Sequence, residues 1–518
     1  MIASIPLWVA NGLGTELVTA FESAFGFLLS PVGLLLVVAG TLLGLLMGVL
    51  PGLGGPVALS LLIPLTFGTD PFVAFTLMAA TLGGVNFGGS VTAIVLNTPG
   101  TAPNAATLFD GHPMAKQGKA ADAIAVSAVA SGIGALLGLL LFVLFLPFVA
   151  PIALSFWSPE YFWLAVLGLA TIAVAARGSM LDDLIAGGVG VMLTFHGIST
   201  VTGGVRYTAG GQYLQGGVPL VPVLIGLFAI AQMAHIFSQG TIATAARTGG
   251  SRVAGSVTVL RRWQQTLRSS VIGWVVGVVP GVGGTVANFI AYLQAKRSAS
   301  DPSAFGTGAP EGLIASEAAN DAKDGGSLIP TLSLGIPGSA STAVLLGAFL
   351  LHGLTPGPLL LSEGLDVIVI ILLALVGSNV LTSAIGLLAA DRLATVTRLP
   401  TTLIVPVVLS IGAIGAFAVR GQFADIVVAA AFAVVGYLML VADVSRVALI
   451  IGLVLGEIAE ENFHRSLQIA DGSYGVFLAR PGSIALVVVL LIVLSLPVYD
   501  AIRNREAKGD AGRDRNHD

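Results

Sequence analysis

The stretch GVLPGLGGPVALSLLIPLT, residues 48–66, decides how the rest of the sequence is interpreted. It is an apolar run that is interrupted by Pro51, Gly52, Gly54 and Gly55. Proline lacks a backbone N–H and glycine permits dihedral angles that other residues avoid, so we predict a helix, a loop and a second helix here. Non-helical backbone at membrane depth persists only where it is buried in protein or lines a wet cavity. The stretch therefore predicts a broken helix inside a membrane.

The composition agrees with that interpretation. Of the 518 residues, 55% are hydrophobic and 10% are charged, whereas a soluble protein is about 25% charged. Apolar runs long enough to cross a bilayer follow one another along the chain, and they predict an all-α polytopic membrane protein with about 12 transmembrane helices, some of them broken or re-entrant. The absence of cysteine excludes disulfide and thiol chemistry, and the net charge of -4 gives no indication of a nucleic-acid partner.

The same interruption occurs twice in the chain. GVLPGLGG at 48–55 matches GVVPGVGG at 277–284, and GGSVTAIVLNTPGTA at 88–102 matches GGSLIPTLSLGIPGSA at 325–340, in the same order. Internal repeats with interrupted apolar segments at corresponding positions are typical of secondary transporters. We therefore predict two structural repeats; their relative handedness depends on the number of crossings between them, and we favour the inverted arrangement.

Basic residues orient the chain, since short cytoplasmic loops hold an excess of lysine and arginine. They gather in the middle of the chain and at its end, and we place both regions in the cytoplasm. The predicted organisation is an N-terminal segment (1–31), a first transmembrane repeat (32–238), a basic cytoplasmic linker (239–268), a second transmembrane repeat (269–500) and a disordered cytoplasmic tail (501–518).

A broken helix exposes backbone groups as ligands. The N-terminus of a helix suits an anion, and the carbonyl groups at its C-terminus suit a small cation. The alternative is a glycine hinge that serves close helix packing; the duplication favours a site. The candidate broken-helix and ion-coupling residues are Pro51, Gly52, Gly54, Gly55, Pro280, Gly281, Gly283, Gly284 and Asn288.

A second pair of breaks follows in LNTPGTAPNAATLF (96–109) and LGIPGSASTAVLLG (334–347). Each ends an apolar run at Pro-Gly and then supplies a hydroxyl, on Thr101 or Ser339, that can cap a new helix. We predict two hairpin tips that meet around a substrate, while Ser90 and Ser327 upstream serve the packing of the hairpin arms. The candidate substrate-binding residues are Asn97, Thr98, Pro99, Gly100, Thr101, Gly335, Pro337, Gly338 and Ser339.

The polar stretch 296–324 precedes the second tip. Helical spacing places Glu317, Asn320 and Asp321 on one face. One interpretation is a solvated helix outside the membrane. The other is a gate or ion-coupling element, in which Glu317 and Asn320 take part.

The paired motifs, together with FGTGAPEGLIASEAANDAKDGGSLIPTLSLGIPGSASTAVLLGA (305–348), closely resemble the large membrane subunit of the tripartite tricarboxylate transporters, the TctA family. The resemblance implies the translocating subunit of a system for uptake of organic carboxylates, citrate among them, across a bacterial inner membrane. It also implies symport with Na⁺ or H⁺, a small membrane subunit and a periplasmic solute-binding protein as partners, and no cofactor or structural metal.

Two other classes are weighed against a transporter. An intramembrane enzyme needs a nucleophile, a base or a metal cluster, but the six histidines are scattered and no HExxH motif is present. A passive anion channel needs a continuous pore, whereas duplicated breaks within one chain favour alternating access. We therefore expect a transporter and not an enzyme.

Overall fold

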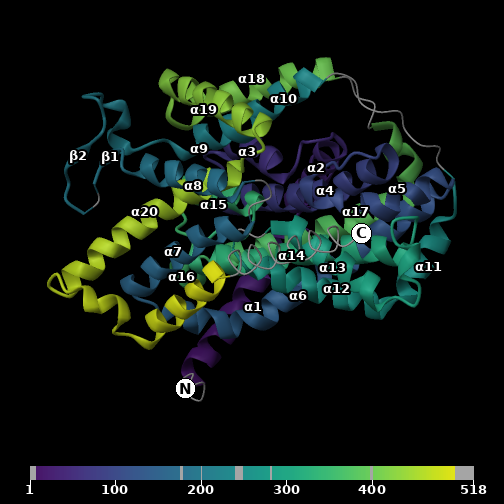
Figure 1. Cartoon of the computed structure of the whole chain (residues 1–518), viewed down its shortest axis with the longest axis horizontal. Coiled ribbons are helices and arrows are strands. Elements are labelled where there is room, and N and C mark those ends of the chain that lie inside the picture. The colour runs from purple at the N-terminus through teal and green to yellow at the C-terminus, as the bar shows by residue number, and fades with distance from the viewer. Residues whose placement is uncertain are drawn as a thin grey trace, which may run out of the picture. The chain divides into compact units, whose positions relative to one another are not determined.

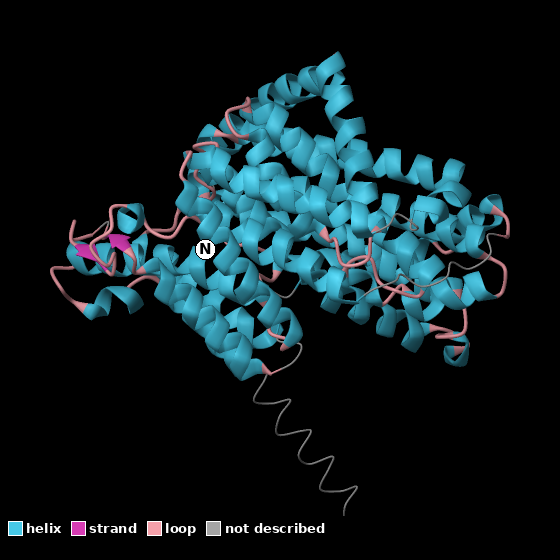
Figure 2. Cartoon of the chain, turned by 90° about the horizontal axis from the view of Figure 1, so that it is seen from above, coloured by secondary structure: helices cyan, strands magenta, loops and turns pink. Residues whose placement is uncertain are grey.

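In the computed structural model, helices make up nearly all of the part that it describes, which is residues 7–175, 179–199, 201–239, 249–280, 283–396 and 401–495. The strands in those ranges are one antiparallel pair of two residues each, β1 (Gly197–Ile198) and β2 (Val205–Arg206), seen in magenta in Figure 2. The predicted all-α fold is confirmed.

The chain divides into two compact units, and many of their helices and strands are labelled in Figure 1. The larger unit, Met1–Leu154 with Pro219–Val441, contains α1 (Leu7–Leu29), α2 (Pro31–Val49), α3 (Gly55–Thr66), α4 (Pro71–Leu96), η1 (Ala102–Ala105), α5 (Leu108–Lys116), α6 (Ala120–Leu154), α9 (Leu220–Leu224), η3 (Ile225–Ile230), α10 (Ala231–Gln239), α11 (Arg252–Arg261), α12 (Trp263–Val278), α13 (Gly283–Ser298), η4 (Pro302–Ala304), α14 (Pro310–Leu334), α15 (Ala340–Leu351), α16 (Pro358–Glu363), α17 (Leu365–Val396), α18 (Thr401–Arg420) and α19 (Phe423–Val441). The smaller unit, Ser155–Val218 with Ala442–Asp518, contains α7 (Ser158–Ala175), α8 (Met180–Thr194), β1, β2, η2 (Tyr213–Gly216), α20 (Arg446–Ile469) and η5 (Tyr474–Leu478).

These units group the chain differently from the five predicted segments, which stay a prediction. The tail 501–518 and residues 240–248 of the linker lie outside the described residues.

Six helices in the described ranges are long and apolar enough to cross a membrane. They are Pro31–Val49, Pro71–Leu96, Ala120–Leu154, Leu220–Ser238, Leu365–Ala389 and Phe423–Val441. Shorter apolar helices accompany them at Gly55–Thr66, Ala340–Leu351, Ile404–Arg420 and Pro481–Ser495. Two of these shorter helices, α3 and α15, follow predicted breaks directly, so the polytopic fold with broken helices is confirmed.

The first break separates α2 from α3. Between them Gly52 has a φ of 83°, in the left-handed region that glycine adopts without penalty. Pro56 then occupies the first turn of α3, where its missing N–H leaves no helix bond unmade. In the second copy α12 ends at Val278 and α13 begins at Gly283; Gly281 lies outside the described residues.

Glycine contacts hold each broken helix against its long neighbour. A Cβ on Gly44 would overlap the carbonyl oxygen of Thr81, and one on Gly48 would overlap that of Val85, so α2 and α4 touch backbone to backbone. The same contacts occur between α12 and α14, where Gly273 lies on Ala319 and Gly277 lies on Lys323. The two α12 glycines are 229 positions after the two α2 glycines, and the contacted α14 residues are 238 positions after the contacted α4 residues.

We expect Gly48→Val to destabilise the larger unit by about 1–3 kcal/mol, because a side chain would force α2 away from α4. The measurement is the melting temperature of the detergent-solubilised protein. Gly26→Val is the control, since nothing lies within 4 Å of a Cβ on that α1 residue. Equal melting temperatures for both variants would contradict the close contact.

Candidate functional site

Each hairpin tip begins where a long helix ends in the left-handed conformation. Asn97, directly after α4, has a φ of 55°, and Gly335, directly after α14, has a φ of 71°. Glycine adopts this backbone freely and asparagine is among the few side chains that tolerate it. Asn97 and Gly335 therefore meet the same backbone requirement, so the two tips can differ in sequence at this position.

The tip glycines pack against backbone. The N–H of Gly100 donates to the carbonyl oxygen of Gly89 at 3.3 Å, and a Cβ on Gly100 would overlap Gly48 and Gly89. In the second tip a Cβ on Gly338 would lie 2.7 Å from the Cα of Ser327. This packing explains the repeated Pro-Gly; direct contact of Gly100 and Gly338 with a substrate stays a prediction.

The two tip hydroxyls differ in what they bind. Ser339 Oγ accepts from the N–H of Thr342 at 3.2 Å, and the N–H of Ser339 donates to Thr342 Oγ1 at 2.8 Å. This reciprocal pair caps α15, as the sequence predicted. The prediction that Thr101 caps a new helix was wrong. Its hydroxyl donates to the side-chain oxygen of Asn104, and the helix that follows is one 3₁₀ turn.

The remaining tip residues differ in exposure. Asn97 is exposed, Thr98 and Pro99 are half-buried, and Gly335 and Pro337 are buried. The first tip is therefore the more exposed one. Substrate binding by these residues stays a prediction.

Each break meets the tip of the other copy. A Cβ on Gly55, at the start of α3, would overlap Ser341 Oγ of α15. A Cβ on Gly284, in the first turn of α13, would lie 3.1 Å from Pro103 of η1. Positions 55 and 284 differ by 229, and positions 103 and 341 by 238, which are the offsets of the helix contacts above. Reciprocal contacts of this kind are expected of similar elements related by a two-fold axis; the two structural repeats and their inverted arrangement stay a prediction.

α14 carries charged residues through the core of the larger unit. The exposed fractions are 0% for Glu317, 2% for Asp321, 5% for Lys323 and 6% for Asp324. The helix is buried because α4, α6, α12 and α13 pack around it. The interpretation of residues 296–324 as a solvated helix is therefore wrong for its α14 part, and a gate or ion-coupling role stays a prediction.

Four hydroxyl groups surround Glu317. Its carboxylate accepts from Ser90 and Ser127 at 2.6 Å each, from Ser131 at 3.1 Å, and from Thr107. These donors come from α4, from the residue before α5, and from α6, so the carboxylate joins three neighbouring segments to α14. Ser90, for which we predicted a packing role from the sequence, is one of these donors.

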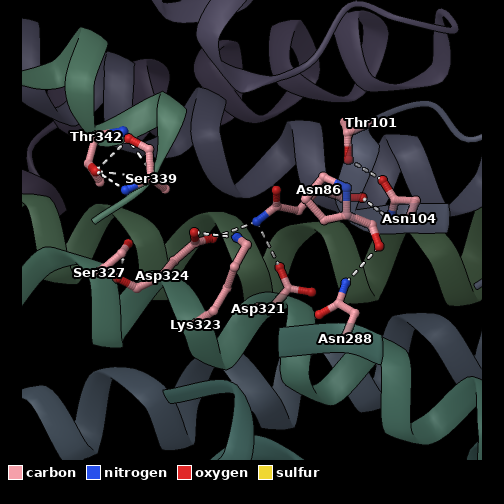
Figure 3. A network of polar contacts seen from close by, with 11 residues as sticks. Asn86, Thr101, Asn104, Asn288, Asp321, Lys323, Asp324, Ser327, Ser339 and Thr342 are labelled. Carbon is pink, nitrogen blue, oxygen red and sulfur yellow. Dashed lines mark hydrogen bonds and ion pairs between the residues drawn. The ribbon is translucent and has the colours of Figure 1, made fainter. Parts of the chain in front are cut away.

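A second network surrounds Asp324 (Figure 3). Lys323 Nζ lies 2.6 Å from Asp324 Oδ1, and Asn86 Nδ2 donates to Asp324 Oδ2 at 2.5 Å and to Asp321 Oδ1 at 3.3 Å. Asn104 Nδ2 donates to the backbone carbonyl oxygen of Asn86 at 3.4 Å and to Ser90 Oγ at 2.8 Å, so it connects this network to the one at Glu317. Carboxylates, amides and one ammonium thus form a continuous buried polar network, which we call the α14 network.

Lys323 connects the network to the second break. A Cβ on Gly284 would overlap Cδ and Cε of Lys323, so the lysine stem crosses the first turn of α13. On the same helix, Asn288 Nδ2 donates to the carbonyl oxygen of Pro103 at 2.8 Å. The break of one copy, the tip of the other and the charged face of α14 therefore lie together.

Sequence reasoning missed most members of the α14 network: Asn86, Asn104, Thr107, Ser127, Ser131, Lys323 and Asp324. A signal existed for the asparagines, because each is a lone amide within or beside an apolar run, in GGVNFGGS and in TAPNAATL. Polar side chains inside membrane segments mark functional sites. No comparable signal existed for Lys323, because a polar stretch resembles a solvated helix until its neighbours are known.

The chain belongs to the tripartite tricarboxylate transporter TctA family, whose sequence model matches residues 34–451. The matched range contains both breaks, both tips and the whole α14 network. Membership makes the chain a multi-pass membrane transporter, and the large subunit of a tripartite tricarboxylate transporter.

Two proteins of Agrobacterium vitis are similar to this chain. A 52.8 kDa protein from the TAR-I ttuC' 3' region is 31% identical over 503 residues, covering 95% of this chain and 98% of that protein. A protein from the TAR-II ttuC' 3' region is 29% identical over 233 residues, covering 45% of this chain and 96% of that protein. No solved structure matches the chain.

We expect Lys323→Met to cost about 3–5 kcal/mol of stability, because it leaves Asp324 as a buried charge without its partner. Lys323→Met combined with Asp324→Leu should recover most of this loss. Chemical unfolding of the detergent-solubilised protein measures both variants.

Arg465→Met is the control, because its ion pair with Glu461 is exposed, with 57% and 38% of the two side chains accessible. An exposed pair contributes about 0.2–1 kcal/mol. A Lys323→Met loss no larger than the Arg465→Met loss would show that the Lys323 pair is not buried as described.

Proposed function

We propose that the chain is the translocating subunit of an ion-gradient-driven uptake transporter for an organic di- or tricarboxylate such as citrate, located in a bacterial inner membrane. A small membrane subunit and a periplasmic solute-binding protein complete the system, as the family description "tripartite" indicates. The coupling ion is Na⁺ or H⁺.

The observation that supports this proposal is the reciprocal contact of the two breaks with the two tips, beside the buried ammonium of Lys323. Helices α3, α13 and α15 all begin in this region, and their N-termini carry partial positive charge. Transporters built from repeats bind substrate at the repeat interface with the N-termini of broken helices. Carboxylates need this kind of positive potential in a region without water.

Charge arithmetic supports coupling to a cation gradient. Each anionic charge that enters a cell against an interior-negative potential of 100 mV costs about 2.3 kcal/mol, so a dicarboxylate costs about 4.6 kcal/mol. Entry with three or more monovalent cations reverses the sign of that cost. We therefore expect accumulation of the substrate to require a cation gradient.

The first experiment is uptake of labelled citrate into proteoliposomes that contain this chain with its small subunit, in the presence of its binding protein. Accumulation above equilibrium that collapses without a Na⁺ or H⁺ gradient is the expected result. Equilibration without accumulation would indicate a passive channel. No uptake across a panel of di- and tricarboxylates under either gradient would contradict the proposal.

We expect Lys323→Gln to reduce carboxylate uptake at least tenfold in these proteoliposomes, because Lys323 pairs with Asp324 and crosses the first turn of α13 beside the proposed site. Arg297→Gln should transport normally, since Arg297 is an exposed cation at the end of α13. Quantified insertion of both variants excludes a folding defect. Normal uptake by a well-inserted Lys323→Gln would remove this lysine from the proposed site.

A further inference from the structure

Three buried residues have polar atoms without a hydrogen-bond partner among the described residues: Asp321 of the α14 network, at Oδ2, and beside the network Asn288, at Oδ1, and Asn320, at both side-chain polar atoms. The exposed fractions are 0% for Asn288, 0% for Asn320 and 2% for Asp321. Leaving such groups unsatisfied costs about 1–3 kcal/mol each, and more for a charged one. Three of them in one region indicate a missing ligand.

The contacts around α14 show which side Asn320 faces. Three neighbouring helices each contact two α14 residues that are four positions apart and therefore lie on one face. These residues are Ala319 and Lys323 for α12, Ala318 and Ala322 for α6, and Glu317 and Asp321 for α4. With 3.6 residues per turn, these contacts leave one sector of the helix, and Asn320 lies in it, between the faces taken by α12 and α4.

α13 covers that sector. Its Gly284 lies against Lys323, and its Tyr292 lies 2.7 Å from a Cβ placed on Gly312. As residue numbers rise along α13 they fall along α14, so the two helices are antiparallel. Asn288 is midway between Gly284 and Tyr292 on the same face of α13, which directs it at the middle of this contact. In Figure 3 the side chains of Asn288 and Asp321 are turned toward one another.

The charges at this contact do not balance. Glu317, Asp321 and Asp324 face one ammonium, that of Lys323, which pairs with Asp324. Glu317 is surrounded by four hydroxyl donors, whereas Oδ2 of Asp321 has no hydrogen-bond partner within the part of the chain that the structure describes. A buried carboxylate without a counter-ion costs several kcal/mol, and either a proton or a bound cation removes that cost.

The chemistry of the ligands selects a small monovalent cation. One carboxylate and two amide groups offer oxygen atoms, which hard cations prefer. Divalent ions gather more carboxylates, and among the described residues no three His, Asp or Glu side chains are arranged to hold a metal ion. A single carboxylate charge matches a single positive charge.

We propose that Asp321, Asn320 and Asn288 bind a sodium ion between α13 and α14. Asp321 supplies the charge, and the two amides supply carbonyl oxygens. The assignment of this ion as the coupling ion rests on the proposed function; its binding does not. Because α13 begins at the second break and contacts the first tip, occupation of the site would fix the break against the tip.

The test is the melting temperature of the purified full-length chain in detergent at constant pH and ionic strength, with NaCl compared with KCl and choline chloride. A ligand that binds only the folded state raises the melting temperature. We expect a saturable rise of several degrees with NaCl alone. Binding of ²²Na⁺ to the same sample gives the affinity directly.

Asp321→Asn should weaken ²²Na⁺ binding at least tenfold and abolish the sodium-specific rise. Asn320→Ala and Asn288→Ala should each weaken binding by a smaller factor, which keeps the test informative if Asp321→Asn folds poorly. Asn462→Ala is the matched control: this asparagine of α20 donates to Ile458 at 2.8 Å and is remote in sequence from the site. It should bind sodium as the unaltered chain does.

Two results would overturn the proposal. One is the same melting temperature in all three salts with no ²²Na⁺ bound. The other is sodium binding that survives Asp321→Asn but is lost in Glu317→Gln, which would move the site. Neither result bears on uptake, because the chain is measured without substrate or partners; a proton-driven transporter would remain possible, and failed uptake would leave sodium binding intact.

Discussion

Direct contact between glycine and the carbonyl oxygens of a facing helix is the interaction on which the rest of this structure depends. Gly44 and Gly48 bring α2 onto α4, and Gly273 and Gly277 bring α12 onto α14. Without Cβ atoms the backbones approach closely, so each broken helix ends beside a long unbroken one. The second half of each broken helix then starts at a fixed place, and that place is the tip of the other copy.

The burial of α14 follows from this packing, and burial determines what its polar residues can do. A carboxylate that is 0–6% exposed has almost no contact with bulk solvent, so its charge needs a partner in the protein, a proton or a bound ion. Glu317 accepts hydrogen bonds from hydroxyl groups, and Asp324 forms an ion pair with Lys323. Asp321 is the carboxylate with a free oxygen, and it lies where a cation would connect the second break to the charged helix.

The sequence predicted the fold well wherever backbone chemistry is local. Proline and glycine at 51–55 interrupt a helix in any surroundings, and Ser339 caps the helix that follows it because the capping partner is three residues away. The same prediction was wrong for Thr101, because its hydroxyl donates a hydrogen bond to the side chain of Asn104 in the 3₁₀ turn that follows. Local rules therefore located breaks and tips, and failed where a side chain had a better partner than the backbone.

The sequence by itself determined the membrane-protein class, the duplicated breaks and the family, since these rest on composition, on order and on motifs that need no contacts. Only the tertiary structure decided that α14 is buried and that Asn86, Asn104, Lys323 and Asp324 belong to one network. The physical reason is that burial depends on neighbours distant in sequence. A polar helix has the same kind of sequence whether it lies in water or in a protein core. The helices packed around α14 determine that its charged residues are buried and therefore need partners.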